Sequence, residues 1–389
     1  METRLLQAMR IHGLPMPTPQ YEVWQGSGFV GRVDFAYPDA KVAIQWTAGD
    51  YDSKLSSGLV SSAGPDVFEY HMNTALVTGN QIVALDDVIQ DVKGDYLDAD
   101  IAANSYNGKV YGVRMIDDPQ FVYYRKSMFA AAGLSVPTTF DELMAAAKAL
   151  TTSKVKGLYL GLKGGTDTLA LPFLWSTGQT ALDADHRIAF DGDQTVEALQ
   201  NFRKLYTSGS LLMGATTDFW DPTSFNEGLC AMQWDGLWAM PATQKALGDD
   251  FGVFALPPFV AGGKPVVYNG GWSAFVSAKS HHVDAAKAFV KWLWVDNTAD
   301  QEDWALAYGF HIPPRKSLAA KAAKLQTGPA ADAVKLFNQY GVFDDPFWTT
   351  AMNTAWQDMV SNVVASGKDA RSQLATAKSA VQTELNKNA

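Results

Sequence analysis

The sequence predicts an α/β protein built around a mostly parallel β-sheet, and three observations lead to this prediction. Short apolar segments alternate with helical stretches between residues 21 and 115, among them "YEVW", "KVAIQW", "PDVFEY" and "YGVRMI". Strands separated by crossover segments pair in parallel and carry helices on the faces of the sheet. The composition, 47% hydrophobic and 19% charged, is globular. The 389 residues exceed what one hydrophobic core usually holds, so we expect two domains.

Charge and cysteine content narrow the possible partners. The chain has 41 acidic and 31 basic residues, and the basic residues are scattered singly, which argues against a nucleic-acid partner. Cys230 is the single cysteine, so no internal disulfide can form, and we expect it to be buried. No apolar run reaches the ~18 residues that span a bilayer. Residues 1–20 have no apolar core typical of a signal peptide, and we treat them as a leader of unknown origin.

Several helices follow from local patterns. Thr139 and Glu142 have the spacing of a capping box at the start of a helix over residues 138–150. Residues 194–206 place four apolar side chains on one face, and residues 284–295 carry an apolar stripe that ends at Trp292, which we therefore expect in the core. From Ala330 to the end the pattern is helical, except for "GVFDDPFW".

One glycine motif is typical of dinucleotide binding. Residues 26–31 fit G-x-G-x-x-G after a predicted strand, with Asp50 at the spacing of a ribose ligand. However, Pro38 follows only seven residues after Gly31, which leaves too little chain for a crossover helix. We therefore expect no nucleotide cofactor.

Catalytic and metal-binding patterns are also weak. Asp117 and Asp118 are adjacent, so in an extended segment they point to opposite faces and cannot act as a carboxylate pair by themselves. The segment "GWSAF" departs from the nucleophile elbow because Phe275 replaces its second glycine. His281 and His282 lack the spacing of metal ligands and read as an exposed helix start. We expect no catalytic residues and no metal.

Aromatic residues stand beside turns and short polar residues at several points. Trp272 follows two glycines in "VVYNGGWSAFVSAK", and it could be either core or a surface held open for a ligand. Sugars present apolar faces that aromatic rings cover and hydroxyls that carboxylates and amides bind, so such a set would suit a sugar cleft. Each aromatic taken singly also fits a core. The set comprises Tyr70, Asn73, Asp118, Trp238, Trp272 and Trp348.

The order of segments from about residue 21 onward resembles the extracellular solute-binding proteins of ABC importers, in the carbohydrate-binding group that includes maltose-binding protein. The segments that carry this resemblance are "FAYPDAKVAIQW", "GDYDSKLSSGLVSSAGPDVFEY", "NGKVYGV", "FVYYRKSMFAAAGLSVPTTFDELMAAAKAL", "FNEGLCAMQWDGLWAM", "YNGGWSAFVSAKS", "DAAKAFVKWLW" and "YGFHIPPRKS". Family members usually place a full helix between the first strand and "PDAKV", whereas this chain has only "QGSGFVGRVDFAY" there.

The resemblance implies a two-lobed periplasmic-binding-protein fold, with a mostly parallel sheet and flanking helices in each lobe and a ligand cleft between the lobes. The first lobe would comprise residues 21–114 and 267–315, and the second lobe residues 115–266 and 316–389. The chain would cross between lobes near residues 113–117, 262–268 and 314–318. Closure of the hinge around a ligand would be read by a membrane permease.

The resemblance also implies a function and a set of site residues. The protein would be a monomeric, non-catalytic receptor for a sugar, an oligosaccharide in our interpretation, on the extracellular side of the bacterial cytoplasmic membrane, in the periplasm or lipid-anchored. An ABC permease would be its partner. The implied ligand-binding residues are Tyr70, Asn73, Asp118 with Asp117 as its rival, Trp238, Gly271, Trp272, Trp348 and, as a weaker match, Gln25.

Two alternatives stay open at the level of sequence. The first is a sugar-directed enzyme, either a glycoside hydrolase or a nucleotide-dependent oxidoreductase that uses the glycines of residues 26–31. The second is a binder of a non-sugar solute such as a phosphorylated polyol. That ligand needs clustered cations near the cleft, for which only Arg114, Arg125 and Arg315 are candidates.

Overall fold

The computed structural model describes residues 18–25, 28–37, 42–44, 51–61, 64–190 and 192–387. The chain divides into two compact units, residues 1–64 and residues 65–389, and each is described by itself. Within the described residues, no helix combines the length and the apolar character that crossing a membrane requires.

The described residues of the first unit form a three-stranded antiparallel sheet and the helix α2. Thr18 lies opposite Ala36 and Gln25 lies opposite Gly28 in its first strand pair. A strand therefore follows the glycine motif where a dinucleotide site needs a crossover helix, although residues 26–27 of the motif lie outside the described residues, as do residues 1–17 of the expected leader. The elements are β1 (Thr18–Gln25), β2 (Gly28–Tyr37), β3 (Val42–Ile44) and α2 (Tyr51–Leu59).

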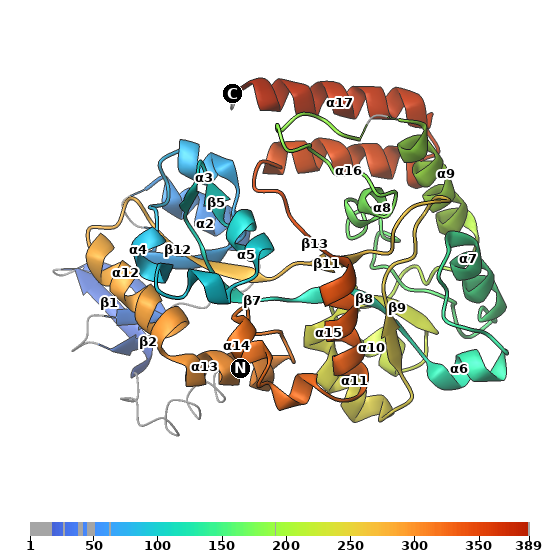
Figure 1. The fold of residues 1–389 in the computed structure, drawn as a ribbon, viewed down its shortest axis with the longest axis horizontal. Coiled ribbons are helices and arrows are strands. Elements are labelled where there is room, and N and C mark those ends of the chain that lie inside the picture. Colours follow the sequence, from blue (N-terminus) through green and yellow to red (C-terminus); the bar gives the residue numbers. More distant parts are fainter. Residues whose placement is uncertain are drawn as a thin grey trace. The chain divides into compact units, whose positions relative to one another are not determined.

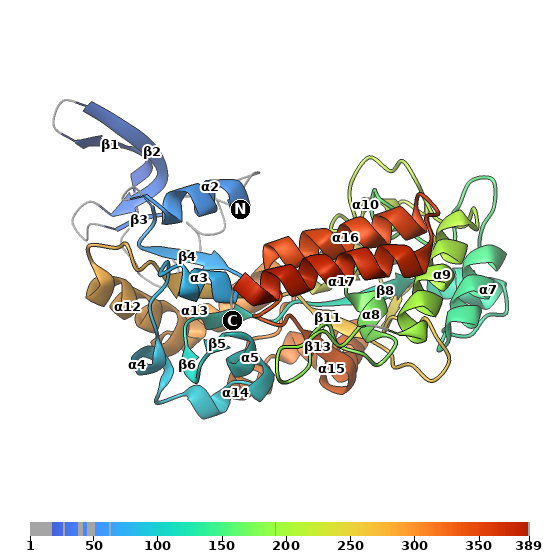
Figure 2. The same cartoon turned by 90° about the horizontal axis from the view of Figure 1, so that it is seen from above.

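The described residues of the second unit form two main sheets and a separate two-stranded hairpin (Figures 1 and 2). The smaller sheet has the strand order β4 (Val67–Tyr70), β12 (Trp272–Val276), β7 (Val113–Ile116). Around it in the sequence are α3 (Thr74–Thr78), α4 (Asp86–Ile89), η1 (Lys93–Asp95), α5 (Asp98–Ala103), the hairpin β5 (Ser105–Tyr106) and β6 (Lys109–Val110), α12 (Val283–Lys291), η3 (Trp292–Asp296), α13 (Thr298–Tyr308) and α14 (Lys316–Ala319).

The larger sheet has the order β10 (Gly252–Phe254), β8 (Pro119–Tyr124), β11 (Val267–Asn269), β13 (Gly341–Phe343), and β9 (Met232–Gly236) also pairs with β8. Figures 1 and 2 show α16 and α17 side by side, and α16 also packs on α9. The helices of this part are α6 (Lys126–Ala131), α7 (Phe140–Ala149), α8 (Pro172–Trp175), α9 (Asp193–Thr207), α10 (Thr223–Asn226), η2 (Leu237–Ala239), α11 (Met240–Leu247), η4 (Ala323–Leu325), α15 (Gly328–Tyr340), α16 (Thr350–Val364) and α17 (Ala370–Lys387).

The pairing of strands corrects the expectation of mostly parallel sheets. Every described pair of named strands in the second unit is antiparallel except β11 with β13. Further parallel neighbours occur only as isolated bridges, at Lys156, Leu158 and Tyr159. Consecutive strands in the chain are often not neighbours, because the chain passes from one sheet to the other between β7 and β8. A crossover predicts parallel pairing only for neighbours within one sheet.

The second passage between the sheets lies at a pair of glycines. β11 hydrogen-bonds to β8 and β13, so Val267–Asn269 belongs to the larger sheet, while β12 begins at Trp272 in the smaller one. The chain therefore changes sheets at Gly270 and Gly271, a few residues after the expected stretch 262–268.

The helix predictions have a mixed outcome. The capping box of Thr139 and Glu142 is confirmed at the start of α7, as is the buried face of α9, formed by Val196, Leu199, Phe202 and Leu205. The stripe on α12 is wrong, because that helix buries Ala286 and Val290 and leaves Trp292 42% exposed. The helix continues as a π-helical turn from Trp292, which rotates Trp294 and Val295 into the core in its place.

Candidate ligand-binding site

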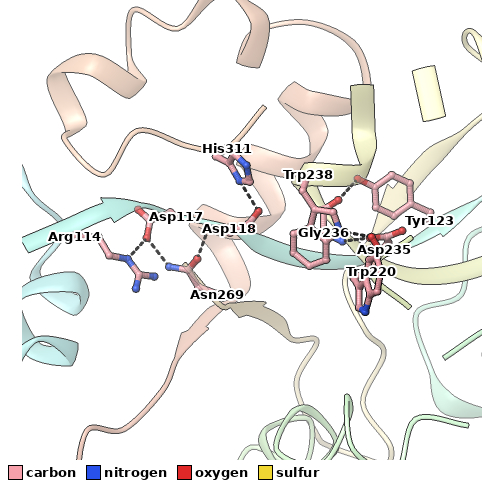
Figure 3. A network of polar contacts seen from close by, with 10 residues as sticks. All are labelled: Arg114, Asp117, Asp118, Tyr123, Trp220, Asp235, Gly236, Trp238, Asn269 and His311. Carbon is pink, nitrogen blue, oxygen red and sulfur yellow. Dashed lines mark hydrogen bonds and ion pairs between the residues drawn. The ribbon is translucent and has the colours of Figure 1, made fainter. Parts of the chain in front are cut away.

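Two adjacent carboxylates occupy the passage from β7 to β8 and point in opposite directions (Figure 3). The Asp117 carboxylate accepts hydrogen bonds from Arg114 Nε at 3.0 Å and Asn269 Nδ2 at 2.7 Å. The Asp118 carboxylate faces His311, with 2.9 Å between Asp118 Oδ1 and His311 Nδ1. The backbone N–H of Asp118 donates a hydrogen bond to Asn269 Oδ1. We call Arg114, Asp117, Asp118, Asn269 and His311 the polar cluster. Its two carboxylates diverge, as expected for neighbours in extended chain.

The Arg114 side of the polar cluster has the character of a structural ion pair. Arg114 Nε lies 3.2 Å from Asp100 and 3.0 Å from Asp117, and the arginine side chain is only 7% exposed. Burial raises the pKa of Asp100 to about 9, and the charge of Asp117 adds to the rise while Arg114 opposes it. Burial also works to lower the pKa of Arg114, but Asp117 and Asp100 outweigh it and hold that pKa above its usual value. Asp117 is therefore committed to protein contacts, and Asp118 is the better ligand candidate.

Gly271 is required by packing beside this ion pair. Its φ is +45°, in the left-handed region that favours glycine. A Cβ at this position would collide with the guanidinium of Arg114 and with the carbonyl of Ile116. The double glycine thus brings the chain close to Arg114, and this contact explains Gly271 without a ligand.

Trp272 begins β12, and its ring contacts a histidine that the sequence did not indicate. The Trp272 and His71 rings lie 4.4 Å apart between centroids, and the indole is half-buried. Burial lowers the pKa of His71 to about 4, with the positive charge of Arg114 as a second cause. The ring of Tyr70 also lies near His71, with 6.0 Å between the two centroids. His71 is therefore neutral near pH 7 and joins the two predicted aromatics into one group.

Asn73 stands at the N-cap position of α3, half-buried, and its side chain makes no capping hydrogen bond. The next residue, Thr74, donates its backbone N–H to the carbonyl of Pro346 at 2.7 Å. The start of α3 is thus tied to the segment that follows β13. This contact places Asn73 near that segment.

Trp238 follows β9, and a second tryptophan fixes its orientation (Figure 3). Its Nε1 donates to the backbone carbonyl of Trp220 at 2.8 Å, and a Cβ on Gly236 would collide with its indole ring. Trp220 itself is 57% exposed. Gly309 lies between Trp238 and His311, since a Cβ there would be 3.0 Å from the Trp238 Cα and 2.6 Å from the His311 Nε2. Trp238 is therefore close to the Asp118 side of the polar cluster.

Asp235 adds a third buried carboxylate near this tryptophan. It accepts hydrogen bonds from the backbone N–H of Gly236 and from Gln233 Nε2. Burial raises its pKa well above the usual value, with Asp118 among the smaller contributions in the same direction. The site therefore disfavours additional negative charge.

Trp348 and Gln25 each have surroundings of their own. Trp348 is 8% exposed and makes edge contacts with Phe190 and Trp356, so it is mainly a core residue with one face on a cavity of about 180 Å³. Gln25 is the last residue of β1 in the first unit. Their predicted ligand contacts stay predictions.

The structure brings together Asp117, Asp118, Gly271 and Trp272, with Trp238 reached through Gly309 and His311. Sequence reasoning missed His71, Trp220, Asn269 and His311 as site residues. Three of these residues had a signal in the sequence. Asn269 stands directly before the double glycine, His311 lies in "YGFHIPP", and Trp220 lies between acidic residues in "DFWDP".

The three arginines named from the sequence are already engaged. Arg114 pairs with Asp100 and Asp117, Arg125 Nη2 lies 2.8 Å from Asp250, and Arg315 Nε lies 2.9 Å from Asp95. A phosphate group would have to compete with these carboxylates.

The catalytic alternatives gain no support from the geometry. Ser273 of "GWSAF" lies inside β12 and is only 1% exposed. It does not stand on the strand-to-helix turn that a nucleophile elbow requires. Cys230 is fully buried, and His281 and His282 are exposed before α12. Across the residues that the structure describes, no three histidine, cysteine, aspartate or glutamate side chains are grouped to hold a metal ion.

The mixed helix-and-sheet chain, which passes between two sheets at Asp117–Asp118 and again at Gly270–Gly271, is consistent with the class of two-lobed binding proteins. The chain belongs to the family of bacterial extracellular solute-binding proteins, whose model matches residues 22–294.

Several relatives are named for the sugars that they bind. The chain is 29% identical over 207 residues to the multiple sugar-binding protein of Streptococcus mutans, and this match covers 49% of each of the two chains. It is 24% identical to the maltotriose-binding protein of Pyrococcus abyssi, over 66% of this chain and 56% of that one. It is 25% identical to the diacetylchitobiose binding protein DasA of Streptomyces coelicolor, over 72% and 67%. The matches thus span about half the length of the first two of these relatives.

Solved structures show the same fold. The GacH receptor of Streptomyces glaucescens, known unliganded and with acarbose, has a TM-score of 0.74 at 22% identity and covers 89% of this chain and 91% of that one. A solute-binding protein of Thermotoga lettingae bound with α-D-tagatose also has a TM-score of 0.74, at 20% identity, over 86% and 89%. UgpB of Mycobacterium tuberculosis in complex with glycerophosphocholine scores 0.73 at 19% identity, over 88% and 89%.

Proposed function

We propose that the protein is a non-catalytic receptor for a neutral sugar, an oligosaccharide, which it delivers to an ABC permease. The observation that carries the proposal is the position of Asp118. This buried carboxylate lies at the passage between the sheets, with His311 at 2.9 Å and with the backbone of Trp238 close to that histidine across Gly309. Carboxylates bind sugar hydroxyls and indoles cover the apolar faces of sugars.

The proposed ligand contacts come from both sheets. Trp272 and Tyr70 extend from the smaller sheet, Asn73 follows β4, and Trp238 follows β9 of the larger sheet. Gln25 and Trp348 are proposed as outer contacts. We also propose the lobes 21–114 plus 267–315 and 115–266 plus 316–389, with β11 moved to the second lobe because it pairs there. Closure of these lobes would signal the loaded state to the permease.

The family and the names of the relatives support this proposal. We infer that the protein acts as a monomer on the extracellular side of the cytoplasmic membrane, as its family membership implies. The sugars named for relatives and structural neighbours provide the first candidates for the ligand.

A phosphorylated polyol is the second candidate ligand, and one structural neighbour, UgpB, is described in complex with glycerophosphocholine. The ion pairs of Arg114, Arg125 and Arg315 argue against it, since the charge of each arginine is already engaged by a carboxylate. The buried carboxylates near Asp118 argue against it as well.

Isothermal titration calorimetry against a panel tests the proposal. The panel comprises maltotriose, diacetylchitobiose, an arabino-oligosaccharide, mannobiose, tagatose and glycerophosphocholine. We expect one sugar to bind with a single site and to remain intact after hours of incubation. Binding of glycerophosphocholine alone would favour the second candidate, and consumption of the sugar would indicate an enzyme.

A further inference from the structure

The cavity beside Trp348 has a different chemistry from the polar cluster. It has a volume of about 180 Å³ and is bounded by β13, by the segment after it and by residues around α8. Phe343 of β13 lies in register with Asn269 of β11, and Asn269 holds both Asp117 and Asp118. The wall of this cavity is therefore one strand away from the polar cluster. We call it the aromatic cavity.

The lining of the aromatic cavity is almost entirely apolar. All lining residues except Thr180 and Asp345 have apolar or aromatic side chains, among them Trp175, Phe343 and Trp348. The hydroxyl of Thr180 already donates to the carbonyl of Leu182 at 2.6 Å. The carboxylate of Asp345 accepts the backbone N–H of Phe347 through Oδ1. One carboxylate oxygen is thus the main side-chain acceptor that a ligand would meet.

The size and lining of the cavity restrict what can fill it. An apolar cavity of about 150 Å³ in another protein stays dry and binds benzene, so a six-membered ring fits a volume of this order. An unmodified hexose would bring several hydroxyls into the cavity, and each one left without a partner loses its hydrogen bonds to water. An apolar substituent has no such cost and gains from leaving water.

We propose that the aromatic cavity accepts an apolar, ring-sized substituent of the bound sugar, so that a glycoside with an aryl-type group binds more tightly than the same sugar without it. This inference rests on the proposed function, since it assigns the sugar to the polar cluster and the substituent to the cavity one strand away. Asp345 would accept at most a single donor of the substituent.

Matched glycosides test this assignment. Each sugar that binds in the calorimetry panel is compared as its methyl and its phenyl glycoside. The phenyl glycoside is expected to bind about tenfold more tightly or better, as for the burial of a phenyl side chain. Equal affinities overturn this inference and leave the receptor function intact, whereas a panel in which no sugar binds overturns the receptor function itself.

Two variants locate the effect in the cavity. Ala181→Leu fills the cavity and is expected to reduce the ratio of phenyl to methyl affinity to about one. Val342→Thr keeps the volume of the wall but adds a hydroxyl, and it is expected to reduce the same ratio without a change of shape. The matched control is Ala285→Leu on the exposed face of α12, which should keep the wild-type ratio. A wild-type ratio in Val342→Thr and in Ala181→Leu would place the phenyl group elsewhere and overturn the assignment.

Discussion

The polar cluster and the aromatic cavity lie on neighbouring strands but differ in almost every property that decides binding. The polar cluster concentrates buried charge, with Arg114 held between Asp100 and Asp117 and with Asp118 facing His311. The aromatic cavity has one carboxylate among apolar walls. A ligand that touches both must therefore offer hydroxyls at one end and an apolar surface at the other.

This contrast also separates residues that hold the structure from residues that are positioned for a ligand. Charges that are paired inside the protein stabilise its fold, and their removal affects folding before binding. The candidate ligand residues Trp238 and Trp272 are half-buried, and their removal should affect binding alone.

The largest effect is expected at Arg114. Arg114→Met leaves the Asp117 carboxylate buried without a cation, which should lower the free energy of unfolding by about 3–5 kcal/mol. Urea denaturation measures the change. The matched control is Arg187→Met, whose exposed ion pair should contribute nothing measurable. A loss at Arg114 no greater than that of the control would remove the structural role of the ion pair.

The next effect concerns Asp118 and sugar affinity. Asp118→Asn keeps the shape of the side chain but removes the charge that strengthens hydrogen bonds to hydroxyls, so the affinity should fall by about 3 kcal/mol, roughly a hundredfold. Calorimetry with the best sugar of the panel measures it. Asp303→Asn on the exposed face of α13 is the control and should bind as wild type does. Undiminished binding by the Asp118→Asn variant would exclude Asp118 from the site.

A pH effect is expected at His71, whose pKa in the folded protein is about 4 instead of 6.5. Above pH 6.5 the histidine is neutral in the folded and the unfolded chain, so its contribution does not change. As the pH falls from 6.5 towards 4, the unfolded chain takes up a proton that the folded protein does not, and stability is lost. At pH 4.5 this loss amounts to about 2 kcal/mol.

The variant His71→Gln isolates this contribution. The difference in unfolding free energy between wild type and variant is measured by urea denaturation at pH 7.5 and pH 4.5. The wild type should lose about 2 kcal/mol relative to the variant on acidification. A difference that is independent of pH would show that His71 is protonated as easily in the folded protein as in the unfolded chain.

The smallest effect compares two tryptophans. Trp238→Ala should weaken sugar binding about tenfold because it removes an aromatic ring from the segment that lies next to His311, on the Asp118 side of the polar cluster. Trp292→Ala changes an exposed tryptophan of the smaller sheet's helices and should bind as wild type. Fluorescence titration with the best sugar distinguishes them, and equal losses in the two variants would refute the position of the site.

Much of the fold could be predicted because local patterns determine it. The capping box of Thr139 and Glu142 and the apolar face of α9 depend on residues a few positions apart, and both are confirmed. The face of α12 could not be predicted in the same way, because this helix has apolar residues on more than one face and tertiary packing buries Ala286 and Val290, while the π-helical turn changes the spacing after Trp292. Strand order depends on the passage of the chain between two sheets, which no local pattern encodes.

The residues of the candidate site also divide into those that local patterns could predict and those that depend on distant contacts. The carboxylates and Trp272 could be named because they follow strands or glycines directly. His71, Trp220 and His311 could not, since their relevance depends on contacts with residues that are distant in the sequence, such as His71 with Trp272. Single-sequence spacing contains no information about such contacts.

A crystal structure with the best-binding sugar of the panel tests the central claim most directly. The account predicts that a sugar hydroxyl lies within hydrogen-bonding distance, about 3 Å, of the Asp118 carboxylate, with a sugar face against Trp238 or Trp272. Arg114 and Asp117 should keep their ion pair without touching the ligand. A sugar bound elsewhere, or bound through Arg114 with Asp118 still facing only His311, would contradict the account.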